Sequence, residues 1–304
     1  MSNNISKRSG IRTSEVRWRE VVLSGGGSSA LGMLGALQWL HDHGKLKHVR
    51  RWVAASAGVI ITILYLADYA PATIFAVLHG FNFQKFADDF NSDGLLGLMD
   101  TMGIMEPGTI MKLVAVMLRK KQIDTRITLE EFDRLTGSTV VITGYSLTRA
   151  QTIAFSSRQH PHMPLLTALR ISLSIPILFR PVMYEDEMYI DGATIEHVPV
   201  RFAKYKTRSL VIHCCQKHPD KWTIPNDLVS FANQLHCQAT RKLENVCVMH
   251  VRRSRPQTVL TVSVQRNSKA YCIDFGITEA AKEVLYQNGK RSARQWDQLN
   301  KDRF

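Results

Sequence analysis

The chain lacks any uncharged apolar run long enough to cross a bilayer. The longest such run covers residues 52–67, which is 16 residues, whereas a spanning helix needs about 20. The first twenty residues contain no apolar block of the kind that a secretory signal requires. These absences predict a cytoplasmic protein that is not secreted and that meets membranes only by peripheral contact.

Cysteine is scarce as well. The five cysteines lie in the last third of the chain, and no C-x-x-C spacing occurs. An odd number without paired spacing argues against a disulfide framework and predicts a reducing compartment. The segment VIHCCQKH does not meet the spacing rules of zinc sites, so we interpret Cys214 and Cys215 as small hydrophobic residues of a buried strand. We expect no metal and no other cofactor.

Acidic residues are outnumbered, and the formal net charge is +13. Such a charge suggests an anionic partner, either nucleic acid or a lipid surface, although it can also serve solubility alone. No nucleic-acid-binding motif is present, and aromatic residues do not alternate with the basic runs, so we do not expect nucleic acid as a partner. Three basic clusters could instead meet an anionic membrane surface: Lys7, Arg8 and Arg12; Arg252, Arg253 and Arg255; Lys290, Arg291 and Arg294.

The sequence predicts one domain preceded by a short arm. We expect residues 1–19 to form a basic amino-terminal arm and residues 20–304 to form a single domain. Its motifs fall between residues 21 and 200, and residues 201–304 form an extension of strands and helices. Within that extension the apolar runs SLVIHCC (209–215) and NVCVMHV (245–251) predict two further strands of the central sheet.

The first repeating unit is a strand, a glycine loop and a helix. VVLS (21–24) is a short buried strand, three glycines follow it, and leucines at helical spacing then lead to a stop at Gly44. WVAAS (52–56) predicts a second strand, and AGVIITILYLADYA (57–70) predicts a second, buried helix. Strands that alternate with helices through short links indicate a parallel sheet.

The glycine loop formally matches a dinucleotide-binding fingerprint, from Gly25 through Gly27 to Ala30. That fingerprint also needs an acidic residue at the end of the second strand, and none is present there. A phosphate-binding P-loop needs a lysine at the end of the loop, and no lysine lies between Gly25 and Gly44. What remains is a loop of bare N–H groups that suits an oxyanion as well as a phosphate.

Ser56 stands where the second strand ends and the second helix begins, in the segment AASAG. A sharp turn there needs very small residues two positions away on each side, and Ala54 and Gly58 meet that need. Such a turn would present the serine hydroxyl beside a helix N-terminus. Two other interpretations stay open at this point: a small serine in a close-packed crossing, or a helix N-cap.

A serine nucleophile needs a base. No histidine stands in a setting that marks it as one, but the segment MYIDGATIEHVPV places Asp191 and Gly192 after a short strand. An Asp-Gly pair on its own is more typical of a hairpin turn.

Together these segments resemble the patatin-like phospholipase family. The resemblance rests on four motifs in the family's order: LSGGGSSALGMLGAL, AASAG, ALRISLSIPILFRPV and YIDGATIEHVPV. It implies a three-layer α/β/α fold with a mainly parallel central sheet. It also implies a catalytic dyad of Ser56 and Asp191, with an oxyanion hole formed by the N–H groups of Gly25, Gly26 and Gly27. The implied reaction is hydrolysis of acyl esters in phospholipids or related lipids, of the phospholipase A or lysophospholipase type, through an acyl-enzyme and without calcium.

The chain departs from the family pattern near both motifs that would hold the reacting ester. The family usually has glycine at the position of Ala54, and a basic residue and a glycine at the positions of Ser29 and Ala30. These changes affect a strained turn and an anion-binding loop. An alternative interpretation is therefore a catalytically inactive patatin-like protein that binds lipid or another partner.

Overall fold

The computed structural model describes residues 17–82, 102–205, 207–217, 224–225, 228–254, 258–265 and 276–301. The predicted amino-terminal arm lies outside these residues except for its last three. Of those three, Trp18 is buried, and its ring lies 5.9 Å from the ring of Trp296 in the last helix.

The described part of the chain alternates strands and helices, as the sequence predicts. The strands are β1 (Glu20–Leu23), β2 (Arg51–Ala54), β3 (Gly103–Met105), β4 (Thr139–Ser146), β5 (Gln151–Ser156), β6 (Ile177–Phe179), β7 (Val182–Tyr184), β8 (Glu187–Asp191), β9 (Ser209–Lys217) and β10 (Val259–Gln265). The helices are α1 (Ala30–Asp42), α2 (Ala57–Leu66), α3 (Pro71–His79), α6 (Gly108–Lys120), α7 (Leu129–Thr136), α8 (Leu165–Ser172), α9 (Leu228–Ser254) and α10 (Glu279–Asn300). Three short 3-10 turns are η1 (Gly27–Ser29), η2 (Gly192–Thr194) and η3 (Val200–Phe202).

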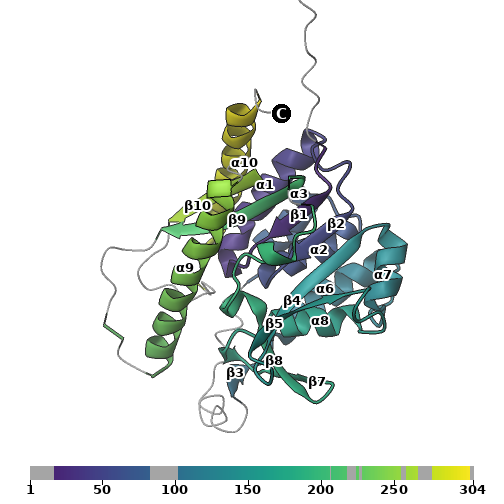
Figure 1. Cartoon of the computed structure of the whole chain (residues 1–304), viewed down its shortest axis with the longest axis vertical. Coiled ribbons are helices and arrows are strands. Elements are labelled where there is room, and N and C mark those ends of the chain that lie inside the picture. The colour runs from purple at the N-terminus through teal and green to yellow at the C-terminus, as the bar shows by residue number, and fades with distance from the viewer. Residues whose placement is uncertain are drawn as a thin grey trace, which may run out of the picture.

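The central sheet is mainly parallel (Figure 1). Its strand order is β10-β9-β1-β2-β4-β8-β7, with β5 also paired to β4. Every neighbour pair from β10 to β4 is parallel, whereas β5 and β8 pair antiparallel to β4, and β7 pairs antiparallel to β8. A second, two-stranded sheet joins β3 to β6.

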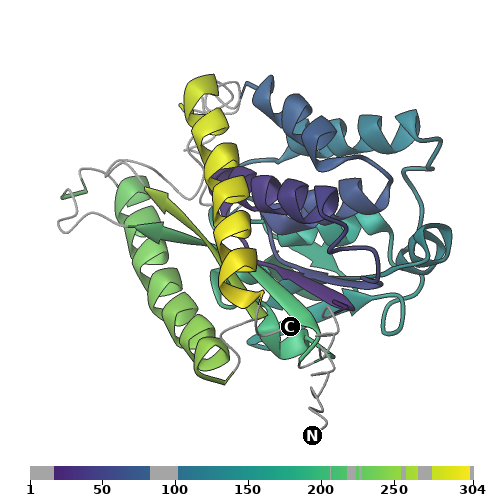
Figure 2. The same cartoon turned by 90° about the horizontal axis from the view of Figure 1, so that it is seen from above.

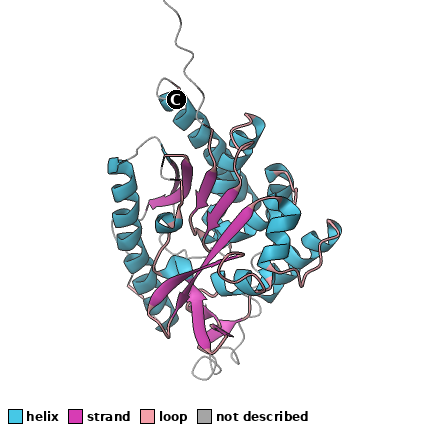
Figure 3. Cartoon of the chain, turned by 45° about the vertical axis from the view of Figure 1, so that its right-hand side comes forward, coloured by secondary structure: helices cyan, strands magenta, loops and turns pink. Residues whose placement is uncertain are grey.

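Helices cover both faces of this sheet (Figures 2 and 3). Alternate residues of β1 point to opposite faces. Val21 and Leu23 join the larger core, which packs α1, α2, α8 and α10 against the sheet. Val22 joins a smaller core on the other face, which also contains Val198 and, from α9, Val248. Since both faces are buried, the strands consist of continuous apolar runs. The predicted three-layer α/β/α fold is confirmed.

One of the two predicted C-terminal strands is wrong. Residues 209–215 lie in β9 as expected, but residues 245–251 lie inside α9, and the outermost strand is instead β10. The valines of this segment suggested a strand, because β-branched residues favour sheets. The longer context decides otherwise, since α9 runs without a single glycine or proline.

Helices α1 and α10 cross closely through glycines. A methyl group on Gly289 would lie 1.8 Å from the Gly32 carbonyl oxygen, and one on Gly35 would lie 1.9 Å from the Tyr286 carbonyl oxygen. The two backbones therefore touch directly, and α10 is fixed against the helix that follows the glycine loop.

We expect Gly289→Ala to lower the free energy of unfolding by about 3 kcal/mol, the upper part of the usual range for overpacking. The neighbour that the new methyl group meets is backbone, which cannot rotate away. Urea denaturation measures the change. A matched control is Gly108→Ala at the start of α6, where an added methyl group meets nothing within 4 Å. Equal stability of the two variants would contradict direct backbone contact between α1 and α10.

Candidate active site

The register of three strands brings Ser56 and Asp191 to the same level of the sheet. β2 ends at Ala54, which pairs with Ile142 of β4. β8 pairs with β4 just beyond this point, where Asp191 lies opposite Gly144. The chain that leaves β2 therefore turns at Ser56 immediately beside the carboxyl end of β8. Two residues that are far apart in sequence become neighbours because both of their strands pair with β4.

Ser56 has a strained backbone conformation, as a sharp turn between strand and helix requires. Its φ is 52° and its ψ is −130°, and its N–H donates a hydrogen bond of 2.9 Å to the Ser172 hydroxyl. Ser56 occupies the N-cap position of α2, but its hydroxyl makes no capping hydrogen bond, so the side chain is left for another role. A methyl group on Gly58 would lie 2.6 Å from the Ser24 carbonyl oxygen, which explains the glycine two residues later. Ala54, where the family usually has glycine, is fully buried within β2, and the turn forms with this residue in place.

Asp191 is buried with only 2% of its surface exposed. Its carboxylate accepts a hydrogen bond of 2.8 Å from the Ala193 N–H, and its own N–H donates to the Ser174 carbonyl oxygen at 2.9 Å. Gly192 fits tightly against β4, since a methyl group there would lie 2.8 Å from the Thr143 hydroxyl oxygen. The Asp-Gly pair thus ends β8 and begins η2 rather than forming a hairpin tip.

Burial raises the pKa of Asp191 to about 7, while hydrogen bonds from the Ser56 hydroxyl and the Ala193 N–H oppose this rise. Burial dominates because it removes water from the charged carboxylate. The Ala193 N–H and the Ser56 hydroxyl both favour the charged form of the carboxylate. A carboxyl with a pKa near neutral pH, close to a serine hydroxyl, can accept and return a proton.

The glycine loop divides into one structural residue and two with available N–H groups. The Gly25 N–H donates a hydrogen bond of 2.9 Å to the His197 carbonyl oxygen, and a methyl group on Gly25 would lie 2.7 Å from the Ala193 Cβ. Gly25 therefore joins the loop to the segment that follows Asp191. Within the described part of the chain, the N–H groups of Gly26 and Gly27 have no such acceptor. Gly27 also lines the same pocket as Ser56.

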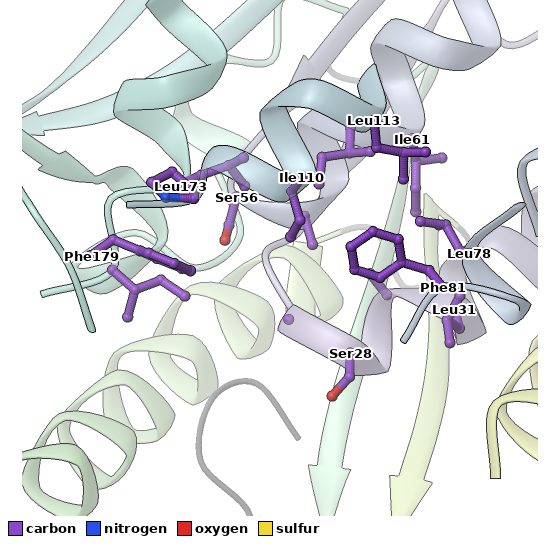
Figure 4. A pocket seen from close by; sticks show the side chains of 16 residues that line it. Ser28, Leu31, Ser56, Ile61, Leu78, Phe81, Ile110, Leu113, Leu173 and Phe179 are labelled. Atoms are coloured by element: carbon purple, nitrogen blue, oxygen red, sulfur yellow. The ribbon is translucent and has the colours of Figure 1, made fainter. Parts of the chain in front are cut away.

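The Ser56 hydroxyl lies in a pocket whose wall is almost entirely apolar (Figure 4). The wall includes Leu31 of α1, Ile60 and Ile61 of α2, Leu78 of α3, Phe81, Ile110 and Leu113 of α6, Leu173, Ile175, and Phe179 of β6. An apolar slot that ends at a serine hydroxyl suits a hydrocarbon chain attached to a reactive carbonyl group.

Sequence patterns did not reveal three residues that support the site. Ser172, the last residue of α8, holds the Ser56 backbone, and nothing in the motif ALRISLSIPILFRPV marked it for this role. The ring of His197 lies beside the glycine loop, with Nδ1 3.2 Å from a methyl group placed on Gly25. The buried Lys282 amine of α10 donates to the carbonyl oxygens of Leu78, His79 and Phe81, at 3.3, 2.7 and 2.6 Å. Lys282 thus holds one wall of the pocket, and a lysine in an amphipathic helix carried no signal for this role.

Two other kinds of feature are absent from the described residues. No helix among them is both long enough and apolar enough to cross a membrane. Their histidine, cysteine, aspartate and glutamate side chains form no group of three that could hold a metal ion. His218, which belongs to the VIHCCQKH segment, lies outside the described residues.

Comparison with known sequences finds similarity over the motif-bearing part of the chain. The profile of the family described as patatin-like phospholipase matches residues 21–204. A probable lipid hydrolase of invertebrate iridescent virus 6 is 29% identical over 199 residues, which cover 63% of this chain and 65% of the viral protein. The match therefore spans just under two thirds of that relative's length. The uncharacterized protein YqhO of Bacillus subtilis is 22% identical over 89% of this chain and 94% of its own length.

Comparison with solved structures finds the same fold at low sequence identity. VipD from Legionella pneumophila superposes with a TM-score of 0.56 at 14% identity, over 92% of this chain and 66% of VipD. The type III effector ExoU of Pseudomonas aeruginosa superposes with a TM-score of 0.54 at 14% identity, over 93% of this chain and 53% of ExoU. Both likenesses concern the arrangement of strands and helices.

Proposed function

Since this chain belongs to the patatin-like phospholipase family, as its motifs predicted, we propose that it is a lipid acyl hydrolase with a Ser56–Asp191 dyad. The reaction class is cleavage of carboxylic esters in phospholipids or lysophospholipids. A relative named as a probable lipid hydrolase supports this class.

One observation carries the assignment of the dyad. A serine hydroxyl at a strained turn interacts with a buried carboxylate and lowers its pKa, and this serine lines an apolar pocket. Strained backbone persists only where surrounding structure holds it, and it is concentrated at functional sites. The strain at Ser56 and the burial of an ionised Asp191 both cost free energy, so both are consistent with a catalytic role.

In the first half of the reaction the Ser56 oxygen attacks the ester carbonyl carbon. The serine proton moves to the Asp191 carboxylate as the new carbon–oxygen bond forms. The carbonyl oxygen becomes an oxyanion, and we assign its hydrogen-bond donors to the N–H groups of Gly26 and Gly27. Gly25 is left out of this set because its N–H is bonded to His197. When the intermediate collapses, the carbon–oxygen bond of the ester breaks, and the leaving alcohol takes the proton from Asp191.

In the second half, water replaces the alcohol and the same groups act again. Asp191, ionised once more, accepts a proton from the water molecule that attacks the acyl-enzyme. The second oxyanion collapses, the bond between the acyl group and Ser56 breaks, and the serine oxygen recovers its proton from Asp191. The products are a fatty acid and an enzyme in its starting protonation state.

The pocket wall favours a long acyl chain over a short or polar one. Its side chains come from α1, α2, α3, α6 and β6, and apart from Ser28 and Ser56 they offer no polar group. Burial of each methylene group contributes about 0.8 kcal/mol. We therefore place the acyl chain in this pocket and the alcohol part of the lipid outside it.

The inactive alternative is less well supported, because the departures from the family pattern leave the reacting groups in place. The turn at Ser56 forms with Ala54 in the position of the usual glycine. Ala30 begins α1 as a buried residue, and Ser29 lies in η1. Neither residue separates the Ser56 hydroxyl from the Asp191 carboxyl.

A fluorophosphonate probe with a long alkyl chain tests the proposal. In such a probe the oxygen of an activated serine bonds to phosphorus while the phosphorus–fluorine bond breaks and fluoride leaves. We therefore expect one adduct per chain, located by mass spectrometry on the peptide that contains Ser56. Release of fatty acid from lysophospholipid micelles should disappear as labelling proceeds. A folded protein that neither reacts with the probe nor releases fatty acid would instead be an inactive, lipid-binding relative.

A further inference from the structure

The outer face of α9 carries a stripe of apolar side chains that the rest of the described chain leaves exposed. Phe231, Leu235, Leu243, Val246 and Met249 are between 39% and 69% exposed. At 3.6 residues per turn their spacings place them within about 120° of the helix circumference. The opposite side of the helix holds Cys237 and Val248, which are buried. We call these five residues the α9 stripe.

This stripe is unusual for a helix on a protein surface. Single exposed apolar residues are common, but several of them along one side of a helix mark a surface that contacts another molecule or a membrane. In the views of Figures 1 and 2, α9 runs along the outside of the molecule, and one of its long sides faces away from the sheet.

The charges on α9 favour an anionic occupant. The helix contains Arg241, Lys242, Arg252 and Arg253 against a single acidic residue, Glu244. Lys242 and Arg253 are exposed, and helical spacing places both within the same sector as the apolar row. Apolar side chains interleaved with cations match the boundary between phosphate headgroups and acyl chains in a bilayer. A protein partner would need acidic groups distributed among apolar ones, and a second copy of this basic chain would bring like charges together.

The position of the stripe relative to the active site also favours a lipid surface. The Thr240 hydroxyl donates a hydrogen bond of 3.3 Å to the carbonyl oxygen of Thr194, which ends the turn that begins at Asp191. The next residue, Ile195, is 41% exposed. Residues of α9 also lie next to β6, whose Phe179 lines the pocket. A bilayer on this face would therefore lie beside the segments that form the active site.

We propose that the α9 stripe is the surface by which this protein docks on anionic lipid bilayers. The apolar side chains enter the headgroup boundary, while Lys242 and Arg253 pair with lipid phosphates. The benefit of docking rests on the proposed function, since docking would bring an insoluble ester to Ser56. Binding itself requires no catalysis.

Binding of a catalytically inactive variant to lipid vesicles tests the proposal. The parent protein carries Ser56→Ala so that the lipid stays intact. Leu235→Gln and Val246→Gln together remove the centre of the stripe, and both positions are exposed, so neither change leaves a cavity. The matched control is Val284→Gln with Leu299→Gln on α10, where the side chains are 59% and 78% exposed. Sedimentation with vesicles of phosphatidylcholine and phosphatidylserine measures the partition coefficient.

We expect the stripe variant to bind these vesicles about tenfold more weakly or worse, because two apolar side chains lose their burial, whereas the α10 control binds like the parent. Lys242→Glu with Arg253→Glu should weaken binding to vesicles that contain phosphatidylserine, with little effect on phosphatidylcholine alone. Equal binding by the stripe variant and the parent would overturn the proposal. So would a parent that is a dimer by light scattering and becomes monomeric in the stripe variant, because the face would then contact a second copy.

The same proteins separate this proposal from the proposed function. Wild-type Ser56 protein and its stripe variant should hydrolyse a water-soluble, short-chain ester at equal rates. If the folded wild type fails to cleave that ester while the parent still binds vesicles through the stripe, the catalytic proposal fails and the docking proposal stands. If cleavage is normal and the stripe has no effect on vesicle binding, only the docking proposal fails.

Discussion

Replacement of Ser56 by alanine should abolish ester hydrolysis while leaving the fold intact. We expect kcat/KM for a water-soluble ester to fall by about 10³-fold or more, as is found when a nucleophile that acts together with its base is removed. The remaining rate would come from the N–H groups of Gly26 and Gly27, which would still stabilise the oxyanion if a water molecule attacked directly. A continuous assay with a chromogenic short-chain ester measures the loss.

This substitution is a clean test because serine and alanine share the Cβ atom that the strained turn must accommodate. The positive φ of 52° is equally costly for both residues, and the Ser56 N–H can still donate to the Ser172 hydroxyl. Circular dichroism and the thermal midpoint should therefore match the wild type. Ser263→Ala is a suitable control, since this serine is exposed on β10, away from the pocket. A Ser56→Ala enzyme that keeps most of its activity would assign the nucleophile elsewhere.

The first two strands and the helices after them could be predicted from the sequence because their signals are local. Short apolar runs predicted β1 and β2 within a residue or two at each end, and the leucine spacing predicted α1. The small residues around Ser56 likewise identified the turn, because a methyl group on Gly58 would strike the Ser24 carbonyl. Structure that depends only on neighbouring residues can be predicted from those residues.

The meeting of Ser56 with Asp191 could not be predicted from residue patterns without the family resemblance. It depends on β4 pairing with β2 over its first half and with β8 over its second half. An Asp-Gly pair carries the same local signal in a hairpin and at the end of β8. Contacts of this kind arise from strand register, which sequence spacing does not encode.

The structural role of Gly25 and the helical conformation of residues 245–251 could not be predicted for a related reason. Three consecutive glycines look equivalent in sequence, but only Gly25 lies against Ala193 and donates to the His197 carbonyl. The valines at 246, 248 and 251 favour a strand locally, yet they belong to a long helix that packs Val248 on the sheet. In both cases tertiary contacts distinguish residues that local propensity treats alike.

Replacement of Asp191 by asparagine should remove activity and raise stability at the same time. Asparagine cannot accept the serine proton, so we expect kcat/KM to fall by about 10²- to 10⁴-fold, the usual contribution of a general base. In the wild type, kcat/KM for a soluble ester should increase with pH through about 7 and then level off, because the carboxyl must be ionised to act. The residual activity of the Asp191→Asn enzyme should lack this inflection. Asp186→Asn, an exposed carboxyl in the turn before β8, serves as the control.

The effect on stability follows from the same pKa and has a defined sign. The pKa of Asp191 is about 7 in the folded protein, against an ordinary value of 3.8, so the folded state binds this proton more tightly than the unfolded state. Its stabilising contribution is complete below about pH 4 and is lost as the pH rises through about 7.

Asp191→Asn avoids this loss, because it has no charge to bury and its amide oxygen can still accept from the Ala193 N–H. We therefore expect the variant to gain on the wild type between pH 4 and pH 7, by roughly 3 to 4 kcal/mol at most, since one pKa unit corresponds to about 1.36 kcal/mol. Urea denaturation at both ends of this window measures the difference, and a gain that is equal at both would show that folding does not raise the pKa of Asp191. A buried carboxyl that costs stability at neutral pH, and that the chain nevertheless places against a serine hydroxyl, is the arrangement that catalysis requires and folding alone does not.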